Sequence, residues 1–374
     1  MTRVLGALGA ELDESLISNI YWPHHQKKHP RHAPRRGHHN PMNDATRIAA
    51  LHVYAIPMRT PFRGITVREG MLVHGPLGWG EFCPFTEYDD HEAASWLNTA
   101  VEQTTVGWPA PVRDRIPVNA TVPAVAPERA FEIVAHSGCR TAKVKVADHP
   151  DSLAEDLARV EAVRSALGPG GNIRVDANGR WDVDTAVTRI RRIDRAAGGL
   201  EYVEQPCRTV DELATVRRRV EVRIAADESI RRADDPLKVA VAGAADIAVI
   251  KCTPLGGVHR ALRVAEAAGL PCVVSSALET SVGLAAQLAL AGALPELEFA
   301  CGLGTVGLLD GDTVSAGHAF RPVDGCLPVP RTPPAPDPAL LDEFRLADPG
   351  RAAWWHDRLA RVADELGAPL IHSG

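Results

Sequence analysis

Six side chains able to transfer protons or bind a metal recur at regular intervals in the middle of the chain. They lie in the segments TAKVKVA, IRVDANG, YVEQP, AADES and AVIKC, and they are Lys143, Lys145, Asp176, Glu204, Asp227 and Lys251. The intervals from Lys145 onward are 31, 28, 23 and 24 residues, which suits one strand, one helix and two loops, a unit of roughly 30 residues. Each side chain stands at or near the end of an apolar run typical of a buried strand. Because parallel strands share one carboxyl edge, we expect all six side chains to converge there.

The three acids of this set are potential metal ligands. Asp176, Glu204 and Asp227 offer hard oxygen atoms with no His or Cys beside them, which favours Mg²⁺, or Mn²⁺, over zinc. The alternative is that each acid forms an ordinary salt bridge, since the chain is rich in arginine. Three acids at successive strand ends favour the metal site.

The lysines are potential proton-transfer groups. Only six of the 41 basic residues are lysine, and three of those six are Lys143, Lys145 and Lys251. Lys143 and Lys145 are two residues apart on a strand, so they point to the same face. Two close ammonium groups beside a divalent cation lower each other's pKa, and a lysine with a lowered pKa is a competent general base. With Lys251 approaching from the other side, these parts describe removal of a proton next to a metal-bound carboxylate, through an enediolate.

Composition limits the class of protein. The 374 residues include 45% hydrophobic and 24% charged side chains, and the formal net charge is −6. These values are typical of a globular protein with a sizeable core and argue against nucleic-acid binding. Seven scattered Cys, no signal-peptide pattern and no run of about 18 apolar residues predict a cytoplasmic protein without membrane spans. The sequence leaves the choice between monomer and homo-oligomer open.

The chain divides into four predicted parts. Residues 1–43 contain HHQKKHPRHAPRRGHHNP and should be a disordered His- and Arg-rich tail, with Met42 as a plausible alternative start. Residues 44–115 predict an α+β domain with a hairpin sheet, a polar loop TPFRGITVREG and a helix DDHEAASWLNTAVEQT. Residues 116–326 should form a barrel. Residues 327–374 combine a Pro-rich linker with a C-terminal helix whose Trp354 and Trp355 should pack on the body of the protein.

The barrel is predicted from eight short apolar strands that alternate with amphipathic helices. The strands are 118–122, 142–146, 172–177, 200–205, 222–228, 245–251, 271–277 and 297–302, and the clearest helices are 151–167, 182–197 and 257–269. No GxGxxG follows the first strand, which disfavours a dinucleotide-binding fold. The pattern therefore indicates an α/β fold of the TIM-barrel type.

The motifs KVK, VDAN, VEQP, DES and IK at these spacings resemble the enolase superfamily, in its muconate lactonising enzyme subgroup. The likeness covers about residues 45–325. It implies an α+β capping domain joined to a modified (β/α)8 barrel of the form (β/α)7β.

Within the subgroup, PVNATV, VKVA, DES, SSALETSVGL and GLGT are most similar to the o-succinylbenzoate synthases of menaquinone biosynthesis. This resemblance implies an Mg²⁺-dependent lyase that dehydrates 2-succinyl-6-hydroxy-2,4-cyclohexadiene-1-carboxylate to 2-succinylbenzoate. Lys145 would take the α-proton and then assist departure of the hydroxyl group, so both would leave from the same face. Lys251 would stabilise the intermediate from the opposite face, and Lys143 would support Lys145.

The resemblance also suggests residues around the reacting groups. Asp176, Glu204 and Asp227 would hold the metal, with Asn178 and Glu228 supporting them from behind. The residues expected near the succinyl chain are Ser275, Ser276 and the backbone near Gly302, with Arg63 and Arg68 as weaker candidates for substrate binding.

Other functions fit the same motifs. An N-acylamino-acid racemase, or another enolate-forming epimerase, would use Lys145 and Lys251 equally well. The segment CGLGTVG lacks the acid-rich pattern of dipeptide epimerases. A barrel retained only as a non-catalytic scaffold would not need all three acids and both lysines.

Overall fold

The computed structural model describes residues 47–48, 50–231, 243–367 and 371–372. The predicted tail, residues 1–43, lies outside these residues. Among the described helices, none is both long and apolar enough to cross a membrane.

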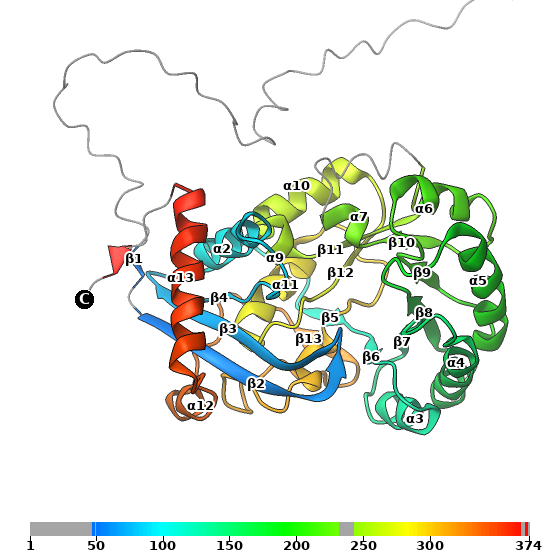
Figure 1. Ribbon diagram of the computed structural model, residues 1–374, viewed down its shortest axis with the longest axis horizontal. Helices are drawn as coiled ribbons and strands as arrows, with labels where there is room; N and C mark the ends of the chain where they lie inside the picture. The colour runs from blue at the N-terminus through cyan, green and yellow to red at the C-terminus, as the bar shows by residue number, and fades with distance from the viewer. Residues whose placement is uncertain (1–46, 49, 232–242, 368–370, 373–374) are drawn as a thin grey trace, which may run out of the picture. The chain divides into compact units, whose positions relative to one another are not determined.

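The larger part of the described chain is a curved parallel sheet with helices on its outer side (Figure 1). The strand order is β12-β11-β10-β9-β8-β7-β6, so each strand pairs with its neighbour in sequence. Seven of the eight predicted strands are therefore present. Their bounds are β6 (Ala120–Val122), β7 (Thr141–Lys145), β8 (Asn172–Asp176), β9 (Tyr202–Glu204), β10 (Ile224–Ala226), β11 (Ile247–Ile250) and β12 (Cys272–Val274).

The predicted eighth strand, residues 297–302, is too long. Only two residues there pair with neighbours: Cys301 bridges to Val118 and Gly302 bridges to Ser275, both in parallel sense. These bridges join the two edges of the seven-stranded sheet, so the sheet closes without a full strand. Phe299 instead packs its ring on Tyr202, with centroids 6.0 Å apart.

Local capping signals set the ends of some of the outer helices. The helix α5, Val183–Ala197, starts after Asp182, whose carboxylate accepts the amide of Thr185, and stops at Gly198 with φ of 65°. The helices expected at 151–167 and 257–269 correspond to α4 (Leu153–Leu167) and α10 (Val258–Ala268). The remaining barrel helices are α3 (Pro127–Ala135), α6 (Val210–Arg217), α7 (Glu228–Arg231), α9 (Cys252–Leu255), α11 (Ser281–Ala293) and the 3-10 turn η2 (Gly304–Leu308).

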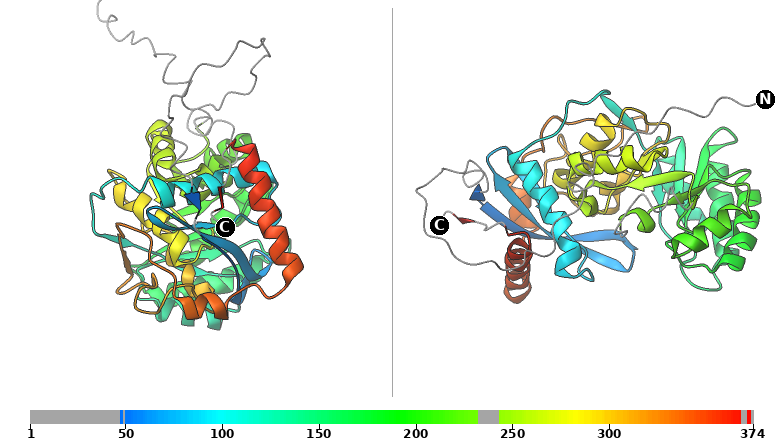
Figure 2. Two further views of the ribbon diagram at one scale, coloured as in Figure 1. Left: turned by 90° about the vertical axis from the view of Figure 1, so that its left-hand side faces the viewer. Right: turned by 90° about the horizontal axis from the view of Figure 1, so that it is seen from above.

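The capping region is an antiparallel sheet with helices packed against it (Figure 2). Its strands are β2 (Ala50–Phe62), β3 (Ile65–Gly75) and β4 (Gly78–Phe82), and the predicted helix is α2 (Asp90–Thr105). The expected polar loop TPFRGITVREG is wrong in extent. It is the end of a long β2–β3 hairpin, and only Arg63 and Gly64 form the turn.

The C-terminal residues return to this sheet. After α12 (Pro338–Glu343), the helix α13 (Pro349–Glu365) packs on it, and Trp355 is fully buried and donates to Glu69 at 2.9 Å. The predicted packing of the tryptophans is thus observed. The remaining short strands are β1 (Arg47–Ile48) paired with β14 (Ile371–His372), and β5 (Arg115–Pro117) paired with β13 (Cys326–Pro328).

Candidate active site

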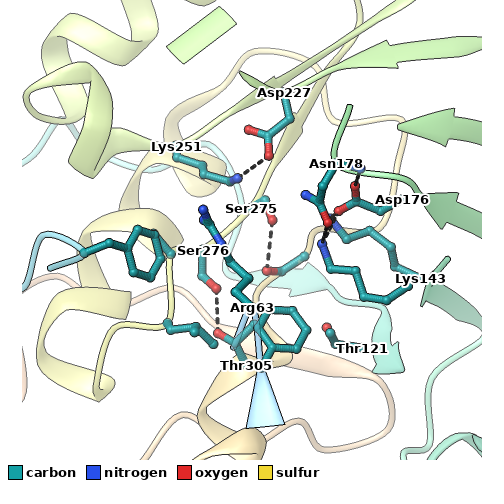
Figure 3. A pocket seen from close by; sticks show the side chains of 16 residues that line it. Arg63, Thr121, Lys143, Asp176, Asn178, Asp227, Lys251, Ser275, Ser276 and Thr305 are labelled. Atoms are coloured by element: carbon teal, nitrogen blue, oxygen red, sulfur yellow. Dashed lines mark hydrogen bonds and ion pairs between the residues drawn. The ribbon is translucent and has the colours of Figure 1, made fainter. Parts of the chain in front are cut away.

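One pocket opens at the carboxyl ends of the barrel strands, beneath the tip of the β2–β3 hairpin (Figure 3). Five of the six side chains selected from the sequence line it, and Glu204 lies directly beside it, bonded to Lys143. The structure therefore brings together groups separated by up to 108 positions, from Lys143 to Lys251. The lining residues are Phe62, Arg63, Phe85, Thr121, Lys143, Lys145, Asp176, Asn178, Asp227, Lys251, Ser275, Ser276, Ala277, Leu278, Gly302 and Thr305.

Strand register explains why these groups meet. Lys145 pairs with Asp176, and Asp176 pairs with Glu204, across β7, β8 and β9. Asp227 and Lys251 directly follow β10 and β11. Lys145, Asp176 and Glu204 therefore stand at one level of three neighbouring strands, where side chains are within contact distance. Asp227 lies two residues beyond Ala225, the partner of Glu204, and Lys251 follows the end of the next strand.

The lysines and carboxylates form a network of buried ion pairs. Lys143 Nζ lies 2.7 Å from Glu204 Oε1 and 3.2 Å from Asp176 Oδ2. Lys145 Nζ lies 2.5 Å from Asp176 Oδ2 and 2.8 Å from Asn178 Oδ1. Lys251 Nζ lies 2.6 Å from Asp227 Oδ2. Three ammonium groups thus balance three carboxylates, as buried charges require.

The three predicted metal ligands face these lysines rather than one another. No three Asp, Glu, His or Cys side chains of the described residues are arranged to hold one ion as they stand. The donor set nevertheless fits a divalent cation, because hard oxygens lie on adjacent strands and the buried Oε2 of Glu204 has no hydrogen-bond partner among the described residues. Lys143 Nζ contacts both Asp176 and Glu204, so these two acids could bind one ion only if the ammonium group moved.

The pKa values of the two neighbouring lysines shift in opposite directions. Burial lowers the pKa of Lys145 and outweighs the opposing charge of Asp176, while nearby Lys143 lowers it further. Burial would also lower the pKa of Lys143, but the charges of Glu204 and Asp176 outweigh burial and raise it. Among the protein's own groups, the two carboxylates that touch the ammonium group of Lys143 thus outweigh the effect of the neighbouring Lys145. Lys145 is the better general base.

The backbone turns sharply just beyond several of these strands. Ala147, Asn178, Gln205 and Leu278 have φ of 62°, 47°, 40° and 63°, values in the left-handed region. Non-glycine residues there carry strain and persist only where neighbouring contacts hold them. Such strain is concentrated at functional sites.

Two residues that support the site were not predicted from the sequence. The side chain of Gln205 accepts the amides of Asp227 at 2.9 Å and Ser229 at 3.2 Å, which fixes the backbone that carries Asp227. Arg159 donates to the main-chain oxygen of Lys145 at 3.0 Å. Gln205 stands in the VEQP motif, so its proximity to Glu204 was a usable signal, whereas nothing local marks Arg159.

The residues predicted to bind substrate line the same pocket as the lysines and carboxylates. Ser276 Oγ is 2.6 Å from Thr305 Oγ1, and Ser275 Oγ donates to the oxygen of Gly302 at 3.4 Å (Figure 3). The guanidinium of Arg63 lies over the ring of Phe85, 4.4 Å from its centroid.

Of two further residues predicted for the site, Asn178 lines the pocket and Arg68 does not. Asn178 donates to Glu228 Oε1 at 3.3 Å, as a supporting pair behind Lys145 would. Arg68 is not among the pocket-lining residues and is only 3% exposed. The prediction that Arg68 contacts the substrate is therefore wrong, because its guanidinium donates to the main-chain oxygens of Leu278, Ala277 and Cys83.

Six pocket residues were not predicted: Phe62, Phe85, Thr121, Ala277, Leu278 and Thr305. Phe62 and Phe85 belong to the capping region and reach the pocket only through tertiary packing. Thr121 faces Lys143 across β6 and β7 in register, which its place in PVNATV could have suggested.

Comparison with known families supports both parts of the fold. Residues 126–333 match the model described as enolase C-terminal domain-like, and residues 53–104 match the enolase N-terminal domain-like model.

Curated relatives share most of their length with this chain. It is 62% identical over 311 residues to the o-succinylbenzoate synthase of Thermobifida fusca, covering 82% of this chain and 94% of that protein. It is 56% identical over 313 residues to the o-succinylbenzoate synthase of Mycolicibacterium smegmatis, covering 83% and 94%.

Solved structures show the same fold at lower identity. The 2-chloromuconate cycloisomerase of Rhodococcus opacus 1CP aligns with a TM-score of 0.68 at 22% identity, over 80% of this chain and 99% of that one. The N-succinyl Arg/Lys racemase of Bacillus cereus aligns with a TM-score of 0.66 at 20% identity, over 80% and 98%. Together they place the described chain in the barrel-plus-cap architecture.

Proposed function

Because the chain belongs to the enolase superfamily, and within it to the o-succinylbenzoate synthase family, we propose that it dehydrates 2-succinyl-6-hydroxy-2,4-cyclohexadiene-1-carboxylate to 2-succinylbenzoate. This reaction belongs to menaquinone biosynthesis and makes the protein a carbon–oxygen lyase. The observation that carries the proposal is the pocket itself. Lysines approach from β7 and from the end of β11, and they share the pocket with carboxylates on the strands between.

The proton transfer is assigned to Lys145. As the free amine, Nζ takes the proton from C1 of the substrate, and the electron pair left behind forms an enediolate with the carboxylate group. That electron pair then forms the new ring double bond as the C6–OH bond breaks. The Lys145 ammonium group returns its proton to the departing hydroxyl, so water leaves and the amine is restored. One residue serves both steps because proton and hydroxyl leave from one face.

The lowered pKa of Lys145 supports this assignment, because an amine must be available to take a proton. Asn178 Oδ1 orients the ammonium group of Lys145, and Arg159 holds its main-chain oxygen. Lys251, with three strands between it and β7, would stabilise the developing negative charge from the other side. Lys143 keeps its proton and would contribute positive charge near the substrate carboxylate.

Asp176, Glu204 and Asp227 would hold Mg²⁺, with Mn²⁺ as a substitute. When bound, the ion supplies positive charge that stabilises the carboxylate as it becomes an enediolate. Glu228 and Asn178 would orient this group of ligands from behind. Gln205 would keep Asp227 in place through its backbone amide.

Ser275, Ser276 and Gly302 would contact the succinyl chain, and Arg63 would attract its terminal carboxylate. Arg63 is partly exposed at the hairpin tip, with Glu87 3.7 Å from its guanidinium. An arginine that is paired only weakly can exchange this partner for a substrate carboxylate.

The test is an ultraviolet assay of the purified protein with Mg²⁺ and the cyclohexadiene substrate, following loss of the diene absorbance. We expect rapid loss that requires the divalent ion. No loss of absorbance, with metal binding intact, would refute the proposal.

A second candidate is N-acylamino-acid racemisation, which two lysines on separate strands would allow. It is tested with an N-acylamino acid in D₂O, scored for deuterium at the α-carbon. Exchange much faster than diene loss would make racemisation the main activity.

A further inference from the structure

One wall of the pocket is a short segment that the capping region holds in place. It runs from Ala277 to Gly283, between β12 and the first turn of α11, and its first two residues line the pocket. Three buried side chains of the capping region bind its backbone: Arg68, Glu81 and Gln103. The wall therefore depends on residues about 200 positions away.

Arg68, on β3, makes the contacts nearest to the pocket. Its Nε donates to the oxygen of Leu278 at 2.9 Å, and its Nη2 donates to the oxygen of Ala277 at 3.2 Å and also to that of Cys83. The same guanidinium lies 4.9 Å from the ring centroid of Phe85. One planar group thus holds the Ala277–Leu278 wall and supports an aromatic ring that lines the same pocket.

No ion pair of Arg68 is found among the described residues, so its partners are main-chain oxygens and an aromatic ring. Burying a charged group to bind only neutral oxygens is costly for folding. Arginine suits such a position because its rigid fork fixes several acceptors in one plane, which lysine cannot do.

The conformation that Arg68 holds is a strained one. Leu278 has φ of 63°, in the left-handed region, and has a branched side chain that disfavours it. Its carbonyl is the acceptor for Arg68 Nε, and the amide of Ala277 donates to Glu279 Oε2 at 2.7 Å. Without the guanidinium, the segment would be expected to relax toward ordinary backbone angles.

Glu81, on β4, holds the other end of the segment. Its carboxylate accepts from the amide of Thr280 at 3.1 Å, from Thr280 Oγ1 at 2.6 Å and from the amide of Gly283 at 2.8 Å. An anion at the start of a helix satisfies amides that have no partner within the helix. Gln103 Nε2 donates to the oxygen of Val282 at 2.9 Å. Both ends of the wall are therefore fixed to the capping region.

We propose that Arg68 is a positioning residue for the substrate pocket, which holds the Ala277–Leu278 wall and Phe85 at the distance that the substrate requires. It acts through the backbone and touches neither substrate nor metal. Its loss would impair substrate binding far more than proton transfer by Lys145. The part concerning substrate rests on the proposed function, whereas the part concerning the wall does not.

The variants Arg68→Lys and Arg68→Met test this proposal, with Arg59→Met as the matched control. Arg59 is also a capping-region arginine that donates to a barrel carbonyl, that of Leu309 at 2.9 Å, but it is half exposed and lies outside the pocket lining. We expect both Arg68 variants to raise KM about tenfold or more with a smaller change in kcat, and the control to change neither. Added guanidinium ion should partly restore KM in Arg68→Met.

Hydrogen exchange followed by mass spectrometry supplies a readout that needs no substrate. The amides of residues 277–283 should exchange faster in both Arg68 variants than in the parent or in Arg59→Met. Unchanged exchange there would overturn the proposal, as would KM values equal to that of the control. Failure of both Arg68 variants to fold would also overturn it, since Arg68 would then be a stability residue. If the parent shows no dehydration, the proposed function fails, and the exchange comparison still decides the role of Arg68 in the wall.

Discussion

Replacing Lys145 by alanine should abolish dehydration while leaving the fold intact. Its Nζ is the group assigned both to remove the proton and to return one to the leaving hydroxyl. General acid–base catalysis by one side chain contributes about 10²–10⁴-fold to a rate. Because both steps use the same atom, we expect kcat to fall at least about 10³-fold.

The effect on stability should be much smaller, for a reason visible in the site. Removing one member of a buried ion pair costs about 3–5 kcal/mol when the other charge is left alone. Asp176 would not be left alone, because Lys143 Nζ lies 3.2 Å from the same oxygen. We therefore expect a loss well below that range, visible as a small fall in melting temperature.

The ultraviolet assay of diene loss measures the rate, and thermal unfolding measures the stability. Lys145→Arg is the informative companion, since arginine keeps the positive charge beside Asp176 but stays protonated at neutral pH. It should be as inactive as Lys145→Ala. Activity within about tenfold of the parent in either variant would exclude Lys145 as the proton-transfer group.

Asp227→Asn should weaken Mg²⁺ binding measured by calorimetry, because one of three hard anionic ligands is lost, and unchanged affinity would make this acid structural. Trp355→Ala should lower the free energy of unfolding by about 3–5 kcal/mol in urea titrations, since the ring is fully buried against the capping sheet; a loss below about 1 kcal/mol would contradict that packing. Burial raises the pKa of Asp312, so the folded state holds this proton more tightly than the unfolded state does. The contribution of Asp312 to stability should therefore fall as pH rises through its raised pKa, and Asp312→Asn should flatten that part of the stability curve. Deleting residues 1–41 should leave the melting temperature unchanged, and a clear fall would show that the tail packs.

The reactive groups of the pocket could be predicted from the sequence because their positions depend on the order of the strands. Lys145, Asp176 and Glu204 end successive strands, and parallel pairing places them side by side without any knowledge of packing. Helix ends were readable for a similar reason. Asp182 and Gly198 act on the backbone within a few residues of themselves, so the limits of α5 follow from local contacts.

Features that depend on contacts between distant segments could not be predicted from the sequence. The segment 297–302 has the composition of a strand, yet only Cys301 and Gly302 find partners between the two sheet edges. Arg63 and Arg68 are five residues apart in one hairpin, yet one faces the pocket and the other binds the carbonyls of Ala277 and Leu278. No local pattern separates two such arginines.

The sequence by itself determined the barrel-plus-cap architecture, the strand-end positions of the lysines and carboxylates, and the class of reaction they suit. These follow from periodicity, short-range capping and the direction of parallel strands. Only the tertiary structure decided which lysine has a lowered pKa, how the barrel closes and how the capping region holds the Ala277–Gly283 wall. Each of these depends on burial and on contacts between segments about 30 to 200 residues apart, and such contacts exist only after the chain has packed.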